Sequence, residues 1–163
     1  MTELPEFWRT EVFHPLSVHF PIALLLAAFL FKLVSFWSKK SMWKEAGSLL
    51  LLFGVFGIWI SIYTGNLANG IVARKICDPT VLKDHQNFAY TTAWIFSGAL
   101  LLDSLINFIK KEFLKNRLYK LLLVVLLTVG SGFLTYVGHL GATLVYQQGA
   151  GVYQPSEDCV EFQ

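Results

Sequence analysis

The chain has 163 residues, of which 55% are hydrophobic and only 15% are charged, and its formal net charge at pH 7 is +2. Soluble domains carry about 25% charged residues, so this composition argues against an ordinary soluble domain and indicates a membrane protein. The length fits a single domain over residues 1–163. The small net charge, without a concentrated basic patch, gives no reason to expect a nucleic acid partner.

Four long apolar runs account for this composition. A membrane-spanning helix needs about 20 predominantly apolar residues, and four segments qualify: residues 15–37, 46–65, 88–109 and 121–146. Short connections join the first to the second and the third to the fourth, so each pair should be antiparallel neighbours. The sequence therefore predicts an all-α membrane protein, an antiparallel four-helix transmembrane bundle in contact with lipid. Duplication of one hairpin is an open interpretation, since the two hairpins share no clear motif.

The distribution of charge predicts the orientation of the bundle. The two short connections are rich in basic residues, namely Lys39, Lys40, Lys44, Lys110, Lys111, Lys115, Arg117 and Lys120. In the N-terminal tail, the middle loop and the C-terminal tail, acidic residues outnumber basic ones. The positive-inside rule makes the lysine-rich connections cytoplasmic. Both termini and the middle loop are therefore expected on the outer face.

The two cysteines agree with this orientation. Cys77 lies in the middle loop and Cys159 in the C-terminal tail, both on the expected outer face. Cysteines in an oxidising compartment can form a disulfide, and this bond would close a loop of about 80 residues, worth up to about 4 kcal/mol. Two free thiols are the alternative, and thiol labelling with and without reductant separates the two.

The four histidines of the chain are the strongest functional signal: His14, His19, His85 and His139. All four fall near the outward ends of predicted helices, and a neutral imidazole can ligate iron, copper or zinc. At about 1.5 Å rise per residue, His14 and His85 should lie near the interface, with His19 and His139 roughly 8–10 Å deeper. His14 and His19 are about 140° apart on a helical wheel. Two sites, or one site plus a hydrogen-bonding histidine, therefore fit better than one flat site.

Small residues surround one of these histidines. Gly138 and Gly141 bracket His139, and Gly130 and Gly132 lie one to two turns deeper. Small side chains let a bulky planar group approach a helix backbone, and close helix–helix packing explains them equally well. Gly138 and Gly141 are therefore candidate cofactor-binding residues.

Haem b, in one or two copies, is the cofactor that these residues favour. The chain lacks the Cys-x-x-Cys-His motif of c-type haem, and few carboxylates lie near the histidines, which disfavours a di-iron centre. Copper or zinc would accept the same ligands, but no Met–His or Cys–His cluster favours them. In the preferred arrangement His19 and His139 ligate one haem, while His14 and His85 ligate a second or support the first. The pairing of His14 with His139 and of His19 with His85 is almost as well supported.

Two charges fall inside predicted spans. Lys32 lies 18 residues beyond His14, and Asp103 lies 18 residues beyond His85. Because the first and third helices run in the same direction, the two charges should lie at similar depth, where an ion pair lowers the cost of both. Snorkelling of Lys32 to the cytoplasmic surface and proton uptake through Asp103 are the alternatives.

Two segments carry a resemblance to a known family. The run from His14 to Ile22 (HPLSVHFPI) resembles the N-terminal signature of domain of unknown function family 2231, a bacterial membrane-protein family. Residues 138–146 (GHLGATLVY) and 149–152 (GAGV) resemble its second signature, with Ala142 at the family's second glycine, and His85 matches the histidine that opens its third helix. The resemblance covers nearly the whole chain. It implies four spans and, because related members are joined to cytochrome c-type domains, redox work.

These observations favour a b-type cytochrome of the bacterial inner membrane. It would transfer electrons at the periplasmic face, between quinone or quinol and an extracytoplasmic redox partner such as a periplasmic cytochrome. The alternatives are a haem-containing quinol or superoxide oxidase, a non-haem copper or zinc membrane protein, and a structural subunit of a respiratory complex. Whether the chain is an enzyme or an electron carrier stays open, as does homo-oligomerisation.

Overall fold

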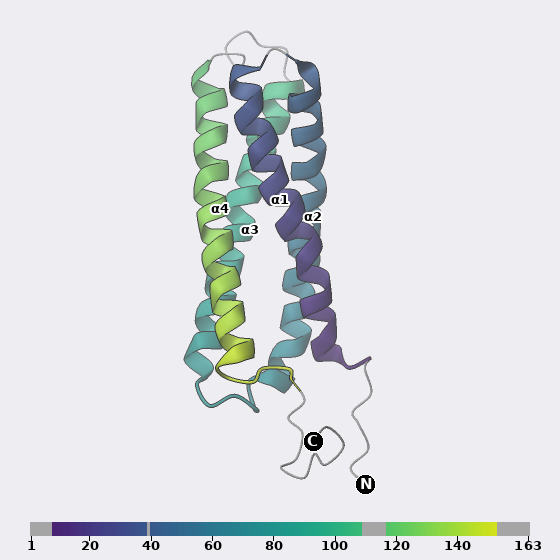
Figure 1. Ribbon diagram of the computed structural model, residues 1–163, viewed down its shortest axis with the longest axis vertical. Coiled ribbons are helices and arrows are strands. Elements are labelled where there is room, and N and C mark those ends of the chain that lie inside the picture. The colour runs from purple at the N-terminus through teal and green to yellow at the C-terminus, as the bar shows by residue number, and fades with distance from the viewer. Residues whose placement is uncertain (1–7, 39, 109–116, 153–163) are drawn as a thin grey trace, which may run out of the picture.

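The computed structural model describes residues 8–38, 40–108 and 117–152, which form four long helices. Their bounds are α1 Thr10–Trp37, α2 Ser41–Val72, α3 Pro79–Phe108 and α4 Arg117–Tyr146 (Figure 1). Each is long and apolar enough to cross a membrane. Each predicted span falls within one of these helices, except for residue 109, which lies outside the described part of the chain. The prediction of an all-α four-helix membrane bundle is confirmed.

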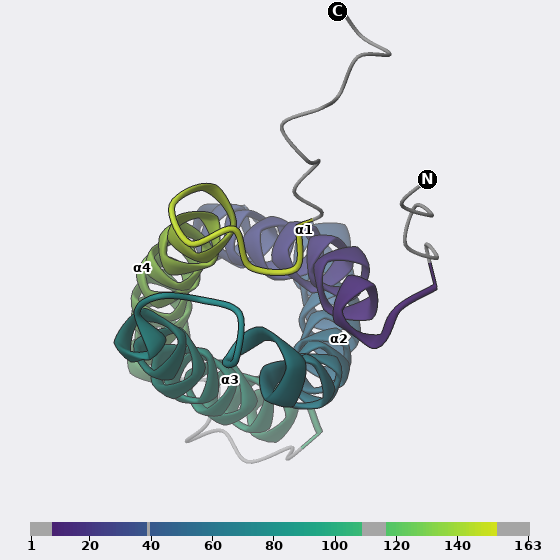
Figure 2. The same cartoon turned by 90° about the horizontal axis from the view of Figure 1, so that it is seen from below.

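The helices form a ring in which α1 faces α3 across the centre (Figure 2). Packing is closest within the α1–α2 and α3–α4 hairpins and looser between them. The start of α1, the 73–78 connection and the end of α4 lie at one end, which we call the histidine end (Figure 1). The end of α1, the start of α2 and the start of α4 lie at the other end, which we call the lysine end (Figure 1). The side of the membrane that each end faces stays a prediction.

Local sequence explains how α3 begins. The carboxylate of Asp78 accepts hydrogen bonds from the backbone N–H of Thr80 at 2.9 Å and from its hydroxyl at 2.6 Å, which satisfies one of the free donors of the first turn. These hydrogen bonds lower the pKa of Asp78. Pro79 occupies the first helical position, where its fixed φ angle and its missing N–H cost nothing.

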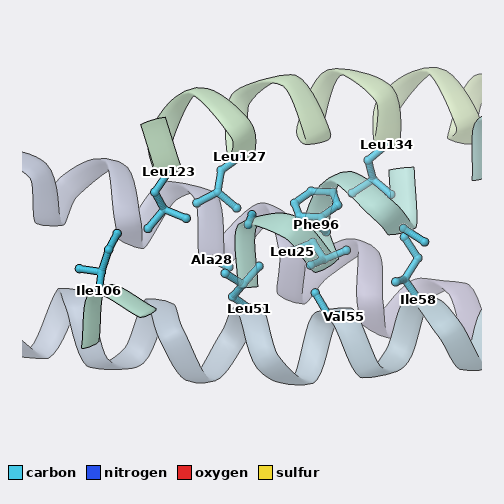
Figure 3. Close-up of a cluster of buried hydrophobic side chains, with 12 residues drawn as sticks. Leu25, Ala28, Leu51, Val55, Ile58, Phe96, Ile106, Leu123, Leu127 and Leu134 are labelled. Carbon is cyan, nitrogen blue, oxygen red and sulfur yellow. The ribbon is translucent and has the colours of Figure 1, made fainter. Parts of the chain in front are cut away.

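Glycines let the two helices of each hairpin approach closely. A Cβ atom at Gly54 of α2 would lie 2.6 Å from Cδ2 of Leu25 in α1. A Cβ atom at Gly130 of α4 would lie 3.1 Å from Cζ of Phe96 in α3. Leu25 and Phe96 are both fully buried and lie in the central apolar cluster of the bundle (Figure 3). Each hairpin thus places a large side chain of its first helix against a glycine of its second.

The burial pattern of the first hairpin recurs in the second. The buried residues of α1 have buried counterparts in α3 at a constant shift of 71 residues, the separation between Lys32 and Asp103. These pairs are Glu11 and Leu82, Pro21 and Thr92, Leu25 and Phe96, Ala28 and Ala99, and Lys32 and Asp103.

The second helices repeat in the same way. Buried positions of α2 recur in α4 at a constant shift of 76 residues: Gly47 and Leu123, Leu51 and Leu127, Gly54 and Gly130, Val55 and Ser131, Ile58 and Leu134, and Ala68 and Leu144. The two hairpins are therefore structural repeats of each other. Their equivalence lies in helix faces and contacts more than in residue identities.

Candidate functional site

A cavity of about 630 Å³ lies between the two hairpins at the histidine end, lined by all four helices and by residues 150–152. This volume lies within the range of about 300–1,000 Å³ that is typical of small-molecule sites. Three of the four histidines and both candidate glycines line it: His14, His19, His85, Gly138 and Gly141. Most of the other lining residues are apolar. The cavity thus gathers most of the residues that the sequence singled out.

His14 reaches from α1 to the neighbouring helix α2. Its Nδ1 atom lies 2.9 Å from the backbone oxygen of Ser61. Because a carbonyl oxygen only accepts hydrogen bonds, Nδ1 carries the hydrogen and donates it. A Cβ atom at Gly65 would lie 3.1 Å from Nδ1 and Cε1 of His14, so the ring occupies the space that this glycine leaves open.

His85 is held in the same way in the second hairpin. Its Nδ1 atom donates to the backbone oxygen of Val137 in α4 at 3.2 Å. A Cβ atom at Gly141 would lie 3.4 Å from Cε1 of His85. Gly141 faces this histidine, whereas a Cβ at Gly138 would meet open space. Of the two candidate glycines, Gly141 makes room for the side chain of His85 and Gly138 leaves room beside the helix backbone.

The two histidines are equivalent members of the structural repeat. His14 and His85 are separated by the 71-residue shift of the first helices, and their anchors, Ser61 with Gly65 and Val137 with Gly141, by the 76-residue shift of the second. The ring centroids lie 6.0 Å apart with an angle of 79° between the ring planes. With each Nδ1–H donated to a carbonyl, the Nε2 atom of each neutral ring keeps its lone pair. A backbone partner of this kind commonly fixes the tautomer of a metal-ligating histidine.

The other two histidines do not join this pair. His19 lines the cavity but its side chain is largely exposed. His139 is exposed and is not part of the cavity wall, and its backbone oxygen accepts a hydrogen bond from Thr143. Of the two pairs in the preferred arrangement, the structure brings together His14 and His85, whereas His19 and His139 are both largely exposed and only His19 lines the cavity. In the alternative arrangement, His139 lies outside the cavity wall that contains His14, whereas His19 and His85 both line the cavity.

Charged residues lie at the mouth of the cavity. Glu11 is buried and lines the cavity, with its Oε1 3.4 Å from Nη1 of Arg9 and 3.9 Å from Nζ of Lys75. The Nη2 atom of Arg9 lies 3.5 Å from the backbone oxygen of Gly151. The Nε atom of Arg9 is buried and has no hydrogen-bond partner within the described ranges. Arg9 is not itself among the lining residues of the cavity, but it contacts two residues that are, Glu11 and Gly151.

The segment after α4 turns back across this mouth (Figure 2). Gly149 and Gly151 have φ angles of 65° and 72°, which side chains with a Cβ rarely adopt. The side-chain oxygen of Gln148 accepts a hydrogen bond from the backbone N–H of Asp78 at 3.2 Å. The segment is thus tied to the α2–α3 connection and forms part of the cavity wall.

Lys32 and Asp103 meet at the lysine end, each with 3% of its surface exposed. Nζ of Lys32 lies 2.6 Å from Oδ1 of Asp103. It also donates to Oγ of Ser48 at 2.6 Å and to the backbone oxygen of Lys44 at 3.1 Å. An ammonium group has three donors, so all three are used. The side chain is held in the bundle and does not snorkel.

The predicted disulfide concerns one described residue. Cys77 is exposed at the histidine end. Its predicted partner, Cys159, lies outside the described residues. The disulfide therefore stays a prediction.

Several residues at the site were not singled out by the sequence. They are Glu11, Arg9, Ser61 and Gly65, which hold the mouth or anchor His14. One signal could have found Gly65: glycines 11 residues apart recur in both second helices, as Gly54 with Gly65 and Gly130 with Gly141. Every residue has a backbone carbonyl, so the residue type at position 61 does not indicate that the Ser61 carbonyl anchors a histidine.

The fold and this cavity define a four-helix membrane protein with a histidine-containing cavity at one end. The chain belongs to the family of predicted membrane proteins DUF2231, whose profile matches residues 11–154. The match spans all four helices, and the resemblance seen in the two histidine-containing segments is confirmed as family membership. No curated protein and no solved structure gave a significant match.

Proposed function

We propose that this protein is a b-type cytochrome in which His14 and His85 hold one haem. The observation that carries the proposal is the symmetric pair of imidazoles. Each comes from an equivalent position of the structural repeat and donates its Nδ1–H to a carbonyl oxygen of its own hairpin. Both side chains line one apolar cavity between the hairpins. Haem b, when bound, supplies one-electron redox chemistry.

The spacing of the two rings fits a shared metal ion. A metal about 2.0 Å from one nitrogen of each ring lies about 3 Å from each ring centre. Two imidazoles on opposite sides of one ion therefore have centres about 6 Å apart, and the centroids of His14 and His85 are 6.0 Å apart. The open space at Gly138 would accept the edge of a planar group beside α4.

The donor set favours haem over copper or zinc. A structural or catalytic zinc site takes at least three protein ligands. Among the described residues, no group of three or more His, Cys, Asp or Glu is arranged to hold a metal ion. Haem provides four nitrogens of its own and needs only axial ligands from the protein.

The position of the cavity suggests where electrons would pass. If the positive-inside rule holds, the lysine end is cytoplasmic and the histidine end faces the periplasm of the bacterial inner membrane. A haem at this end would exchange electrons with a quinol at the interface or with a periplasmic cytochrome. It would serve only the outer half of the membrane, so transfer to the cytoplasmic face would need a second carrier.

The test is haem content in purified full-length protein. We expect a reduced-minus-oxidised spectrum of haem b and, from pyridine haemochrome quantitation, about one haem per chain. His14→Gln and His85→Gln should each lose most of the haem, whereas His139→Gln should keep it because His139 lies outside the cavity wall. Helicity by circular dichroism controls for folding.

Two outcomes would end the proposal. One is purified protein without any haem spectrum, including after reconstitution with hemin. The other is full haem content in both His14→Gln and His85→Gln. Loss of haem in His139→Gln alone would instead favour the pairing of His19 with His139.

A quinol or superoxide oxidase is the second candidate. His19 lines the same cavity, and in the described structure its ring makes no hydrogen bond to a backbone carbonyl. In such an enzyme one axial position of the iron is open. Carbon monoxide binding to the reduced protein separates the two functions, because a haem closed by His14 and His85 would not bind it.

A further inference from the structure

A second cavity, of about 770 Å³, lies at the lysine end. The end of α1, the start of α2, the end of α3 and the start of α4 all contribute to its wall. The buried residues Lys32 and Asp103 are part of its wall. Nothing in the cytochrome proposal uses this cavity.

The charge of this cavity is strongly positive. Five basic residues line it, namely Lys32, Lys40, Lys44, Arg117 and Lys120, whereas Asp103 is the one carboxylate among its described lining residues. Lys32 and Asp103 neutralise each other at 2.6 Å. The three donors of Lys32 are all used. Because Asp103 is paired with Lys32, the described wall holds no further carboxylate for the other four cations.

Two helix starts add to this positive field. α2 begins at Ser41 and α4 at Arg117, both at the wall of the cavity. Neither helix has an acidic residue in its first turn, and no side chain at Lys40 caps α2. The free N–H groups and the helix dipole at such ends favour an anion.

Aromatic side chains frame the opening. Cζ of Arg117 lies 5.1 Å from the ring centre of Phe36, a cation–π contact that holds the guanidinium of α4 against the end of α1. Trp37 is 69% exposed and also lines the cavity. A tryptophan at the end of a spanning helix lies at the depth of the lipid headgroups, so the cavity opens at that level.

We propose that this cavity binds a phosphate group. Four cations without a carboxylate partner in the described wall, two helix starts and an opening at headgroup depth suit the phosphate of an anionic phospholipid. Basic pockets between membrane helices are known to take such headgroups. The same chemistry would accept free phosphate. The buried Lys32–Asp103 pair stands behind the site and prevents the anion from moving further into the bundle.

The test measures binding to purified full-length protein in a zwitterionic detergent. The probes are dioctanoylphosphatidylglycerol, inorganic phosphate and dioctanoylphosphatidylcholine, followed by isothermal titration calorimetry and by the thermal unfolding midpoint. We expect binding of phosphatidylglycerol, of inorganic phosphate, or of both, and much weaker binding of the zwitterionic lipid. Binding of phosphatidylglycerol alone identifies a lipid as the source, and binding of inorganic phosphate alone identifies the free anion.

Charge-removing variants locate the site. At about fivefold in affinity for each lysine near an anionic headgroup, Lys40→Gln/Lys120→Gln should weaken binding by about 30-fold. The matched control, Arg74→Gln/Lys83→Gln, removes the same charge from exposed positions at the histidine end and should bind as the wild type does.

A second variant pair keeps the test decisive if the first fails to fold. Lys44→Gln/Arg117→Gln removes the other two cations and should show the same loss of affinity. The proposal is overturned if neither anionic probe binds at millimolar concentration, or if the cavity variants bind as tightly as the control variant.

Discussion

The buried ion pair at the lysine end gives a quantitative prediction. Lys32 and Asp103 each have 3% of their surface exposed, and among the described residues the aspartate is the one anion that Lys32 contacts. Replacing Asp103 with leucine leaves the ammonium group with the neutral acceptors Ser48 and the Lys44 carbonyl. Removing one partner of a buried pair costs about 3–5 kcal/mol, so we expect Asp103→Leu to lower the free energy of unfolding by that amount.

Loss of the Lys32 proton sets an upper limit on the free energy of unfolding that Asp103→Leu can cost. Neutralising a lysine of ordinary pKa, about 10.4, costs about 4.6 kcal/mol at pH 7 and about 1.9 kcal/mol at pH 9. If the folded variant loses this proton, the unfolded state binds more protons, so stability rises with pH. The deficit of Asp103→Leu should therefore shrink between pH 7 and pH 9.

The double variant separates the pair from its surroundings. Lys32→Met should be about as damaging as Asp103→Leu, but Lys32→Met/Asp103→Leu should lie within about 2 kcal/mol of the wild type, because apolar replacement of a whole buried pair is often neutral. The resulting coupling energy should be about 3 kcal/mol or more. The measurement is reversible unfolding of the purified chain in mixed detergent micelles, followed by helicity.

One exposed substitution serves as the control. Thr128→Leu changes a lipid-facing polar residue of α4 and should alter the free energy of unfolding by less than about 0.5 kcal/mol. The reasoning is refuted if Asp103→Leu is as mild as this control, or if the double variant is as unstable as the two single variants combined.

Three further substitutions test the close contacts and the cap. Gly54→Ala would place a methyl group 2.6 Å from Leu25 and should destabilise the fold by about 1–3 kcal/mol in the same unfolding assay. Gly65→Ala would place one 3.1 Å from the ring of His14, so the proposed haem content should fall while helicity is kept. Because Asp78 has a lowered pKa, its stabilisation of α3 is present above about pH 4 and is lost as pH falls through the lowered value. The amide two residues later should therefore titrate below about pH 3.9 in NMR spectra, and this titration should vanish in Asp78→Ala.

A glycine without close neighbours serves as the control for both helical glycines. A Cβ atom at Gly70 of α2 would meet open space. Gly70→Ala should therefore leave haem content unchanged and leave stability equal or slightly higher, because alanine favours the helix. Equal destabilisation by Gly54→Ala and Gly70→Ala would contradict the close contact of α1 with α2.

Hydrophobic run length was enough to predict the helices, but not which side of each helix faces inward. In a soluble bundle the apolar stripe marks the buried face. In a membrane, lipid tails are as apolar as a protein core, so lipid-facing and buried positions look alike. Depth along the helix therefore placed His19 beside His139, although both side chains are largely exposed. The spacing from His14 to Lys32 and from His85 to Asp103 is 18 residues in both helices. This equal spacing aligned both pairs and was a better guide to contact than depth alone.

The structural repeat has opposite consequences for its two matched pairs, Lys32 with Asp103 and His14 with His85. At the lysine end, equivalent positions hold opposite charges, which neutralise each other at 2.6 Å. At the histidine end, equivalent positions hold identical imidazoles. Each neutral ring donates its Nδ1–H to a carbonyl oxygen, so neither ring has a second N–H to donate to the other. Two lone-pair donors therefore line one cavity, with ring centroids 6.0 Å apart. A ligand that accepts two equivalent lone pairs at once would complete such an arrangement, and the proposed haem iron is a ligand of this kind.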